Sequence, residues 1–345
     1  MATRTYPVGI QTFSDIIEKQ YVYVDKTDLV YRLIRKYKYV FLSRPRRFGK
    51  SLLSSTLHAY FSGKKELFKN LAIESLEKDW NTYPVLHFDM SALKNCPISH
   101  FAEKFNSMLQ PYEEQAGIST PYTTPGTRLK EIIEKTARKT GKKVVIIIDE
   151  YDAPLLDVLH EKEKLETVRN VMQEFFAPIK ICDEHCHFAF ITGITKFSQL
   201  SIFSTINNLA NISMEPEFAA ICGITKEELT TTLSQDIEEM AQHNGVSKSE
   251  MEQMLTDNYD GYHFSRNCPD LFNPFSLMHA FASGEIENYW FASGTSTYLI
   301  RQLQKFRTDI TTLDEIFTFS ASFDRPTEMM TDALPLLYQS GYLTI

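Results

Sequence analysis

The sequence is poor in cysteine and has no long hydrophobic run. Its five cysteines among 345 residues are odd in number and scattered, which does not fit a disulfide framework and favours a reducing, intracellular setting. No apolar run approaches the roughly 18 residues that a membrane-spanning helix needs. The first residues also lack the apolar segment of a signal peptide. These absences predict a soluble, cytoplasmic protein without a membrane partner.

A large excess of basic charge is absent as well. The chain has 36 basic and 44 acidic residues, a formal net charge of −8, which argues against wholesale coating of nucleic acid and leaves only a local basic patch open. Hydrophobic residues make up 43% of the chain, enough for a packed core, and the length suits about two domains. Because residues 340–345 resemble a strand with no polar tail, we expect the natural chain to continue.

Short apolar runs alternate with helical patterns over the first two thirds of the chain. We expect strands at 39–43, 85–89, 144–149 and 187–192, with a last core strand near 211–215. Helical patterns cover 12–38 around an extended piece at 21–24, then 51–61, 97–110, 126–140 and 163–181. This alternation predicts a three-layer α/β domain with a mostly parallel central sheet.

The pattern changes after about residue 225. Helical periodicity continues at 226–242, 247–258, 273–283, 296–306 and 333–339, with Ser247 as a helix cap, and only 342–345 resembles a strand. We therefore expect two domains, an α/β core over residues 1–225 and a mainly helical, winged-helix-like domain over residues 226–345 that is truncated at its C-terminus.

The strongest local motif is a strand that runs through a basic loop into a helix. Residues 41–53 read FLSRPRRFGKSLL, and Gly49, Lys50 and Ser51 open the predicted helix, which is the context of a phosphate-binding loop. Backbone N–H groups at a helix N-terminus offer preorganised donors to a polyphosphate. Lys50 would then reach the β- and γ-phosphates of ATP, and the Ser51 hydroxyl would coordinate Mg²⁺.

One fixed glycine of the phosphate-loop pattern is missing, because Arg44 occupies the position five residues before Gly49. The alternative interpretation is a structural strand–turn–helix with a solvated basic loop. The extra arginines could instead stack on a base or neutralise phosphate, which favours a function. The residues expected to contact the nucleotide are Arg44, Pro45, Arg46, Arg47, Phe48, Gly49, Lys50, Ser51 and Leu52.

A pair of acids follows the most apolar predicted strand. Residues 144–150 read VVIIIDE, so Asp149 and Glu150 lie where a buried parallel strand ends. Asp149 is expected to hold Mg²⁺ through water, and Glu150 to activate or orient the attacking water as a general base. A strand can end in two acids merely because the chain surfaces there. Combined with the Gly-Lys-Ser loop, however, the pair predicts the second half of a nucleotide site.

A third predicted strand, 188–192, ends in the sequence TGITK, residues 192–196. In additional-strand NTPases such a strand lies between the other two and carries a polar residue that senses the γ-phosphate. Thr192 is the best placed for this catalytic role, with Thr195 second, and Lys196 is one of several extra cations. Each of these residues could also simply end a strand.

Five separate blocks, in the same order, resemble one bacterial family. They are VYVDKT (22–27), SRPRRFGKSLL (43–53), IIIDEYDAP (146–154), TGITKFSQLSIFSTINNL (192–209) and YDGYHF (259–264). Over nearly its whole length the chain resembles the predicted AAA-ATPase-like family, which also shows the degenerate first glycine. The resemblance implies a P-loop NTPase fold of the AAA-like, additional-strand class, with Asp149 and Glu150 in the Walker B role.

The resemblance also implies parts outside the core. In related ATPases a C-terminal helical lid or winged helix can touch the nucleotide, which makes Tyr262 and His263 candidate contacts and residues 8–10 a candidate for the adenine side. Longer family members often carry a C-terminal PD-(D/E)XK nuclease-like domain, but this chain has no carboxylate two residues before a lysine. Such a domain, DNA and an oligomer are therefore partners implied by the family only.

One weaker signal is the spacing of Cys182 and Cys186, which falls within that of zinc ligands. The second pair of ligands is missing, so a plain connector is the favoured interpretation.

Three functions fit these residues. The leading one is hydrolysis of Mg²⁺–ATP by an AAA-like P-loop ATPase that moves its lid and signals to a C-terminal effector. The second is a regulatory switch that binds ATP or ADP with negligible turnover, favoured by Arg44 and by the lack of an obvious arginine finger. The third is a P-loop kinase, for which no acceptor site is legible.

Overall fold

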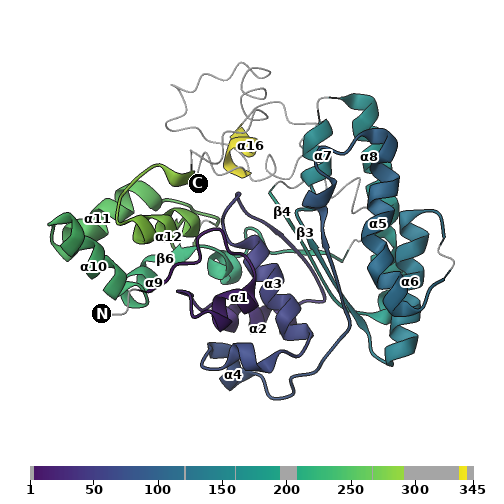
Figure 1. Ribbon diagram of the computed structural model, residues 1–345, viewed down its shortest axis with the longest axis horizontal. Coiled ribbons are helices and arrows are strands. Elements are labelled where there is room, and N and C mark those ends of the chain that lie inside the picture. The colour runs from purple at the N-terminus through teal and green to yellow at the C-terminus, as the bar shows by residue number, and fades with distance from the viewer. Residues whose placement is uncertain are drawn as a thin grey trace.

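The centre of the structure is a five-stranded parallel sheet (Figure 1). The computed structural model describes residues 4–119, 122–159, 161–194, 208–265, 267–290 and 334–339. The strands are β1 (Tyr39–Ser43), β2 (Val85–Asp89), β3 (Val144–Asp149), β4 (Cys186–Gly193) and β5 (Ala210–Asn211), in the spatial order β2-β3-β4-β1-β5. As expected, β4 lies between the strand that precedes the loop and the strand that ends in the acid pair, and it pairs with both.

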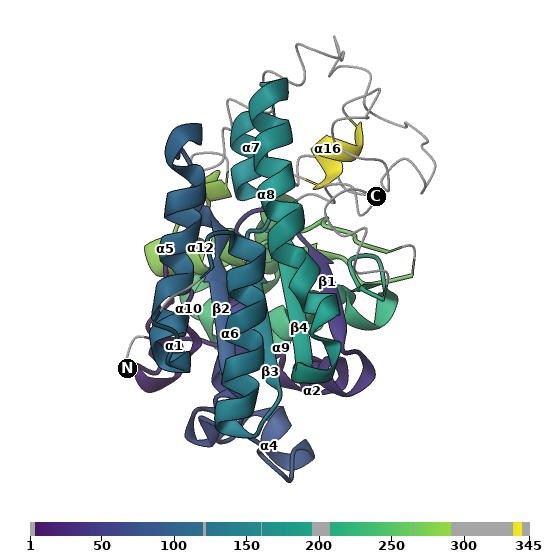
Figure 2. The ribbon, with the colours of Figure 1, turned by 90° about the vertical axis from the view of Figure 1, so that its right-hand side faces the viewer.

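Side chains of the sheet alternate between two cores, because successive residues of a strand point to opposite faces. Val144, Ile146 and Ile148 of β3 pack on one face with α5, α6 and α8, and Val145 and Ile147 pack on the other face with α1 to α3. The first group of helices is α5 (Ile98–Ala116), α6 (Pro125–Thr140), α7 (Ala153–Val158) and α8 (Lys162–Ile181). The second is α1 (Phe13–Glu18), α2 (Thr27–Lys36), α3 (Lys50–Phe61) and α4 (Ala72–Leu76). Figures 1 and 2 show the resulting three layers, helices on both faces of the sheet.

Beyond β5 the described chain is mainly helical. Its elements are β6 (Ile224–Thr225), α9 (Lys226–Thr231), α10 (Ser234–Asn244), α11 (Lys248–Tyr259), β7 (Leu271–Phe272), α12 (Pro274–Ser283) and α16 (Leu334–Gln339). Buried residues of β6 to α12 form a third apolar cluster, which also takes in Val22 from the N-terminal segment. The domain boundary at residue 225 and the winged-helix character stay predictions. Among the described helices, none is long and apolar enough to cross a membrane.

Most predicted elements are found close to their expected bounds. The strand expected near 211–215 is shorter and earlier, and the helix expected over 226–242 is divided into α9 and α10. The division lies at a run of threonines. The Thr230 and Thr231 hydroxyls donate to main-chain carbonyls one turn earlier. Such side-chain bonds compete with the regular main-chain hydrogen bonds of a helix and favour its end. The two-residue pair β6–β7 was too short to predict. The helix at 296–306 and the strand at 342–345 lie outside the described residues.

Candidate active site

The loop between β1 and α3 has the backbone of an anion-binding turn. Gly49 is the N-cap of α3 with φ +92°, and Arg47, two residues earlier, has φ +61°. A Cβ on Gly49 would meet nothing within 4 Å, so glycine is needed there for its conformation rather than for space. Left-handed residues beside right-handed ones turn successive N–H groups toward one point. A turn of this kind can bring its N–H groups and the unpaired N–H groups at the start of α3 to one anion.

Lys50 is buried and turned back on its own loop. Its Nζ donates to the carbonyl oxygens of Arg44 at 3.0 Å and Pro45 at 2.8 Å. Burial lowers the pKa of Lys50, while the negative charges of Asp149 and Glu150 act in the opposite direction. The lysine is thus held at the loop by carbonyls that an incoming anion can replace.

Arg44 corrects one expectation from the sequence. Its guanidinium does not face the loop interior but is buried, with NH groups donating to the carbonyls of Ser213 at 2.6 Å and Ala219 at 3.1 Å. It also lies over the ring of Phe264, 4.1 Å from the ring centre. Arg44 therefore fastens the loop to the segment after β5, and only its backbone is left for a nucleotide.

Arg46, Arg47 and Phe48 in the same loop have different surroundings. Arg46 and Arg47 are exposed, and the Arg47 guanidinium lies 4.0 Å from the ring centre of Phe275 in α12. Phe48 is fully buried and packs edge-on against Tyr262 and Phe264. The expected nucleotide contact Tyr262 is therefore a neighbour of the loop, while His263 pairs with Asp270 at 2.8 Å.

Ser51 and Asp149 are brought together from different elements. The Ser51 side chain lies beside the Asp149 carboxyl group on the wall of one groove and lowers its pKa, but burial is the larger effect and raises the pKa of Asp149 to about 6. A buried carboxylate beside a hydroxyl is a set of hard oxygen ligands, which fits Mg²⁺. No three acidic, histidine or cysteine side chains of the described residues are placed to hold a metal ion. Mg²⁺ does not need such a cluster, since it keeps several waters and phosphate oxygens as ligands.

Glu150 follows Asp149 in a left-handed conformation, with φ +48°. Its backbone N–H donates to Asp149 Oδ1 at 2.9 Å, and its carboxylate forms an ion pair with Lys94 at 2.5 Å. Lys94 was missed in the sequence because no motif surrounds it. Only the pairing of β2 with β3 brings the residues after β2 beside Glu150.

Thr192 is at the expected end of β4. The residue is fully buried, and Oγ1 donates to the carbonyl of Leu42 in β1 at 2.8 Å. A γ-phosphate contact would have to replace this bond, because the hydroxyl has one O–H to donate, and the contact stays a prediction. The alternatives Thr195 and Lys196 lie outside the described residues.

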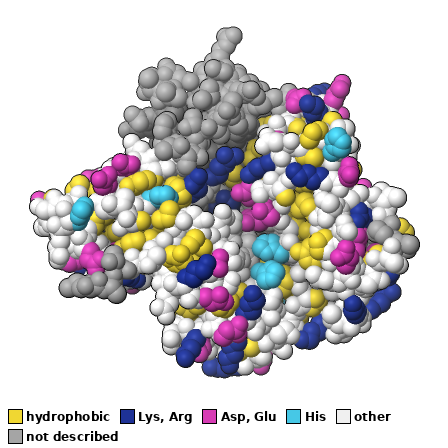
Figure 3. All heavy atoms as spheres, viewed as in Figure 1, with side chains coloured by type: hydrophobic (Ala, Val, Ile, Leu, Met, Phe, Trp, Pro, Cys, Tyr) yellow, Lys and Arg dark blue, Asp and Glu magenta, His cyan; other side chains and the backbone are white. Residues whose placement is uncertain are grey.

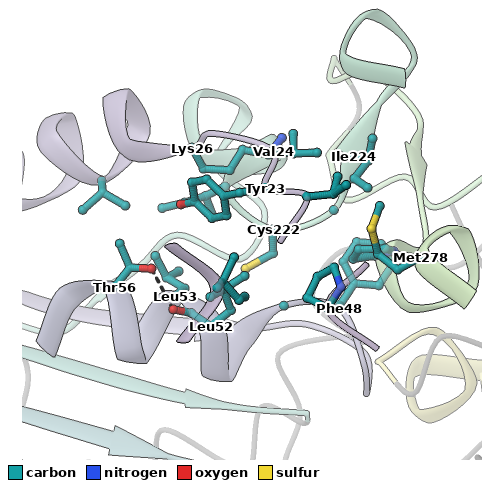
Figure 4. Close-up of a pocket in the computed structure, with 18 residues that line it drawn as sticks. Tyr23, Val24, Lys26, Phe48, Leu52, Leu53, Thr56, Cys222, Ile224 and Met278 are labelled. Carbon is teal, nitrogen blue, oxygen red and sulfur yellow. Dashed lines mark hydrogen bonds between the residues drawn. The ribbon is translucent and has the colours of Figure 1, made fainter. Parts of the chain in front are cut away.

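An apolar pocket of about 100 Å³ adjoins the loop on one side of α3. Figure 4 shows Tyr23, Val24 and Lys26 across the pocket from Leu52 and Leu53, with Phe48, Ile224 and Met278 on its remaining walls. Among residues 7–10, Pro7 lines the pocket, and the expected role of residues 8–10 on the adenine side stays a prediction. Gly223 allows the Phe48 ring to pack close to the backbone at the pocket wall, because a Cβ at residue 223 would lie 2.6 Å from that ring.

A polar groove of about 380 Å³ lies on the other side of α3. It is lined by Ser51, Ser55 and His58 of α3 together with His87, Asp89 and Asp149 from the sheet. Figure 3 shows histidines and acidic side chains gathered in the middle of this face, with basic side chains beside them. Ser51 and Asp149 therefore face this polar groove rather than the apolar pocket.

Comparison with known proteins places the chain among relatives. A family model described as a predicted AAA-ATPase matches residues 7–203. The chain is also 33% identical over 349 positions to an uncharacterized protein encoded in the vnfD 5′ region of Azotobacter chroococcum mcd 1. That match covers all of this chain and 65% of the relative, so the chain spans about two thirds of the relative's length. No solved structure matches.

Proposed function

Because the chain belongs to the predicted AAA-ATPase family, we propose that it binds Mg²⁺–ATP at the loop between β1 and α3 and hydrolyses it. The observation that carries the proposal is the position of the Ser51 side chain beside the Asp149 carboxyl group, on the wall of one polar groove. Ser51 lies in the first turn of α3, which follows β1, and Asp149 ends β3, which is two places from β1 in the sheet. A phosphate-binding loop and a metal-positioning acid need this juxtaposition.

Each residue of the loop has a distinct task in this proposal. The backbone N–H groups of 46–51 and the α3 N-terminus hold the triphosphate. Lys50 exchanges its two carbonyl partners for β- and γ-phosphate oxygens, which suit an ammonium donor better than neutral carbonyls do. Ser51 ligates Mg²⁺ directly and Asp149 does so through water. When bound, the metal neutralises charge on the phosphates.

Glu150 is proposed as the general base. It lies directly after the metal-positioning acid, and its carboxylate would take a proton from the water that attacks the γ-phosphorus, as the bond from that phosphorus to ADP breaks. General-base catalysis of this kind contributes about 10²- to 10⁴-fold in rate.

The apolar pocket is proposed to hold the base of the nucleotide. The pocket is lined mainly by apolar side chains and is partly open to solvent, which suits the apolar faces and polar edge of a flat base. Its walls include Ile224 and Met278, and Arg47 contacts Phe275. A bound nucleotide would thus touch the helical part, which supports a lid that moves with the nucleotide state and signals to a C-terminal effector. A nuclease-like effector, DNA and an oligomer stay predictions.

A regulatory switch with negligible turnover is the second candidate. The observation that favours it is the ion pair between Glu150 and Lys94 at 2.5 Å, since a carboxylate oxygen bound to an ammonium group is a poorer proton acceptor. A switch would use the same loop and metal residues but would stop after binding.

The experiment is Mg²⁺-dependent ATP binding and phosphate release by the purified chain, Lys50→Ala and Glu150→Gln. Lys130→Ala is the matched control, because it removes a surface lysine that pairs with Glu134 at 3.7 Å on α6. For the ATPase we expect Lys50→Ala to lose binding and turnover, and Glu150→Gln to keep binding while turnover falls about 100-fold or more. The control should match the parent in both measurements.

Three results would contradict parts of this proposal. Tight binding without phosphate release by the parent chain would support the switch. If Glu150→Gln released phosphate as fast as the parent, Glu150 would not be the base. Absence of any nucleotide binding would overturn both candidates.

A further inference from the structure

Lys94 occupies a fixed position beside Glu150, the proposed base. It follows a single 3₁₀ turn, Met90–Leu93, that comes directly after β2. The Asp89 side chain caps the start of this turn by accepting from the Ser91 N–H at 2.9 Å. On the other side, the Asn95 N–H donates to Asp157 of α7 at 2.6 Å. The backbone at Lys94 is therefore held at both ends, while its four-carbon side chain can still move.

Lys94 pairs with Glu150, whose carboxylate must be available to take a proton from water in the proposed hydrolysis. Lys94 Nζ lies 2.5 Å from Glu150 Oε2, and both side chains are about one third exposed. Within the described part of the chain, Glu150 is the ion-pair partner of Lys94. A carboxylate in this pair has one oxygen occupied and its charge compensated, so it is a poorer proton acceptor until the pair has opened.

The pair opens at low cost only where Lys94 finds another anion. ATP and ADP differ at this place by the γ-phosphoryl group, which carries more negative charge than one carboxylate. The positive φ of Glu150 and its N–H bond to Asp149 fix the glutamate backbone, so the lysine is the member of the pair that can turn. An exchange of Lys94 from Glu150 to phosphate would place a cation on the transferred group and free the base in one movement.

We propose that Lys94 is the γ-phosphate-reading cation of this site, paired with Glu150 when no γ-phosphate is present and released to the phosphate when ATP is bound. This inference rests on the proposed function. It makes the ion pair a device that couples base activation to the presence of the third phosphate. It also supplies within one chain a cation that other ATPases take from an arginine finger.

The test compares equilibrium binding of Mg²⁺–ADP and of the β,γ-imido analogue of ATP, which the protein cannot hydrolyse. The variants are Lys94→Met, Lys94→Arg, Glu150→Gln and the double variant Lys94→Met/Glu150→Gln, with Lys130→Met as the control. Lys94→Met should weaken the analogue about tenfold or more, as expected for a lost hydrogen bond to a charged group, and leave ADP within about twofold. Lys94→Arg should restore most of the loss, and Glu150→Gln should strengthen the analogue only where Lys94 is present.

Lysine acetylation read by mass spectrometry gives a second readout without turnover. The analogue should protect Lys94 from acetylation more than ADP does, and Lys130 should react equally in both. If Lys94→Met lost affinity for the analogue and for ADP equally, the inference would be overturned. It would also be overturned if Lys94→Met hydrolysed ATP faster than the parent and kept the parent's preference for the analogue over ADP, because Lys94 would then only restrain Glu150. Failure of the parent chain to bind either nucleotide would overturn the proposed function itself.

Discussion

Replacing Arg44 tests whether its side chain stabilises the fold or binds phosphate. The sequence places Arg44 where the phosphate-loop pattern has glycine, so an arginine that contacts phosphate is the natural expectation. In the structure the guanidinium is buried and donates to Ser213 and Ala219. Arg44→Met keeps most of the apolar stem and removes these donors. It should therefore lower stability and leave nucleotide affinity nearly unchanged in the fraction that is folded.

The size of the effect follows from three contacts and one offset. A hydrogen bond from a charged donor contributes about 1.5–3 kcal/mol, and the bonds of Arg44 to the Ser213 and Ala219 carbonyls qualify. The contact with Phe264 adds about 2 kcal/mol when desolvated. Against this, burial of the guanidinium is costly, as its lowered pKa shows, and its Nε has no acceptor among the described residues. We expect a net loss of about 3 kcal/mol in the free energy of unfolding.

Thermal unfolding of the apo protein measures this loss. At about 2–4 °C per kcal/mol, Arg44→Met should melt roughly 6–12 °C below the parent. The matched control is Arg46→Met in the same loop, an exposed position where the change should stay within about 0.5 kcal/mol. If Arg44→Met melted with the parent but bound ATP ten or more times more weakly, Arg44 would act on the nucleotide, and its buried position would have been misinterpreted.

Two further substitutions test the groove and the turn after β3. Burial lowers the pKa of His87 to about 4, so its contribution to stability is complete above pH 6.5 and is lost as the pH falls toward 4. Between pH 7.5 and 5 the parent should therefore lose about 2 kcal/mol more than His87→Gln in urea unfolding, and parallel losses would contradict the buried neutral imidazole. In Gly193→Ala the new Cβ would lie 2.6 Å from Asp152 Oδ1 and 2.7 Å from the Tyr151 ring, which should cost about 1–3 kcal/mol. An unchanged melting temperature would show that this turn yields to a methyl group.

The strands could be predicted from the sequence because local pattern determines them. The run VVIIID is apolar and β-branched at every position before its acid, which is typical of a strand buried on both faces, and β3 has the predicted bounds. The same holds for β1, where a buried run meets a basic loop. The place of β4 between them followed from the family resemblance, since periodicity carries no information about which strands are neighbours.

The roles of particular side chains could not be predicted in the same way. The carbonyls that hold Arg44 belong to residues about 170 positions later in the chain. The partner of Thr192 is a main-chain carbonyl of another strand, and no residue type marks it. Lys94 is one of many lysines until the β2–β3 register places it beside Glu150. Motifs thus predict which residue types reach a site, whereas tertiary pairing decides which of them remain free to act there.

The N-terminal segment constrains how any lid could move. Arg4 forms an ion pair with Asp236 of α10, and Lys26 forms another with Glu228 of α9 at 2.5 Å. Val22, between these two residues in the sequence, is buried in the core of the helical part. Residues 22–26 also form one wall of the apolar pocket, so the segment contacts both the helical part and the proposed base. A helical part that separated from the loop would break these ion pairs or carry the segment with it, and in the second case the pocket would open along α3.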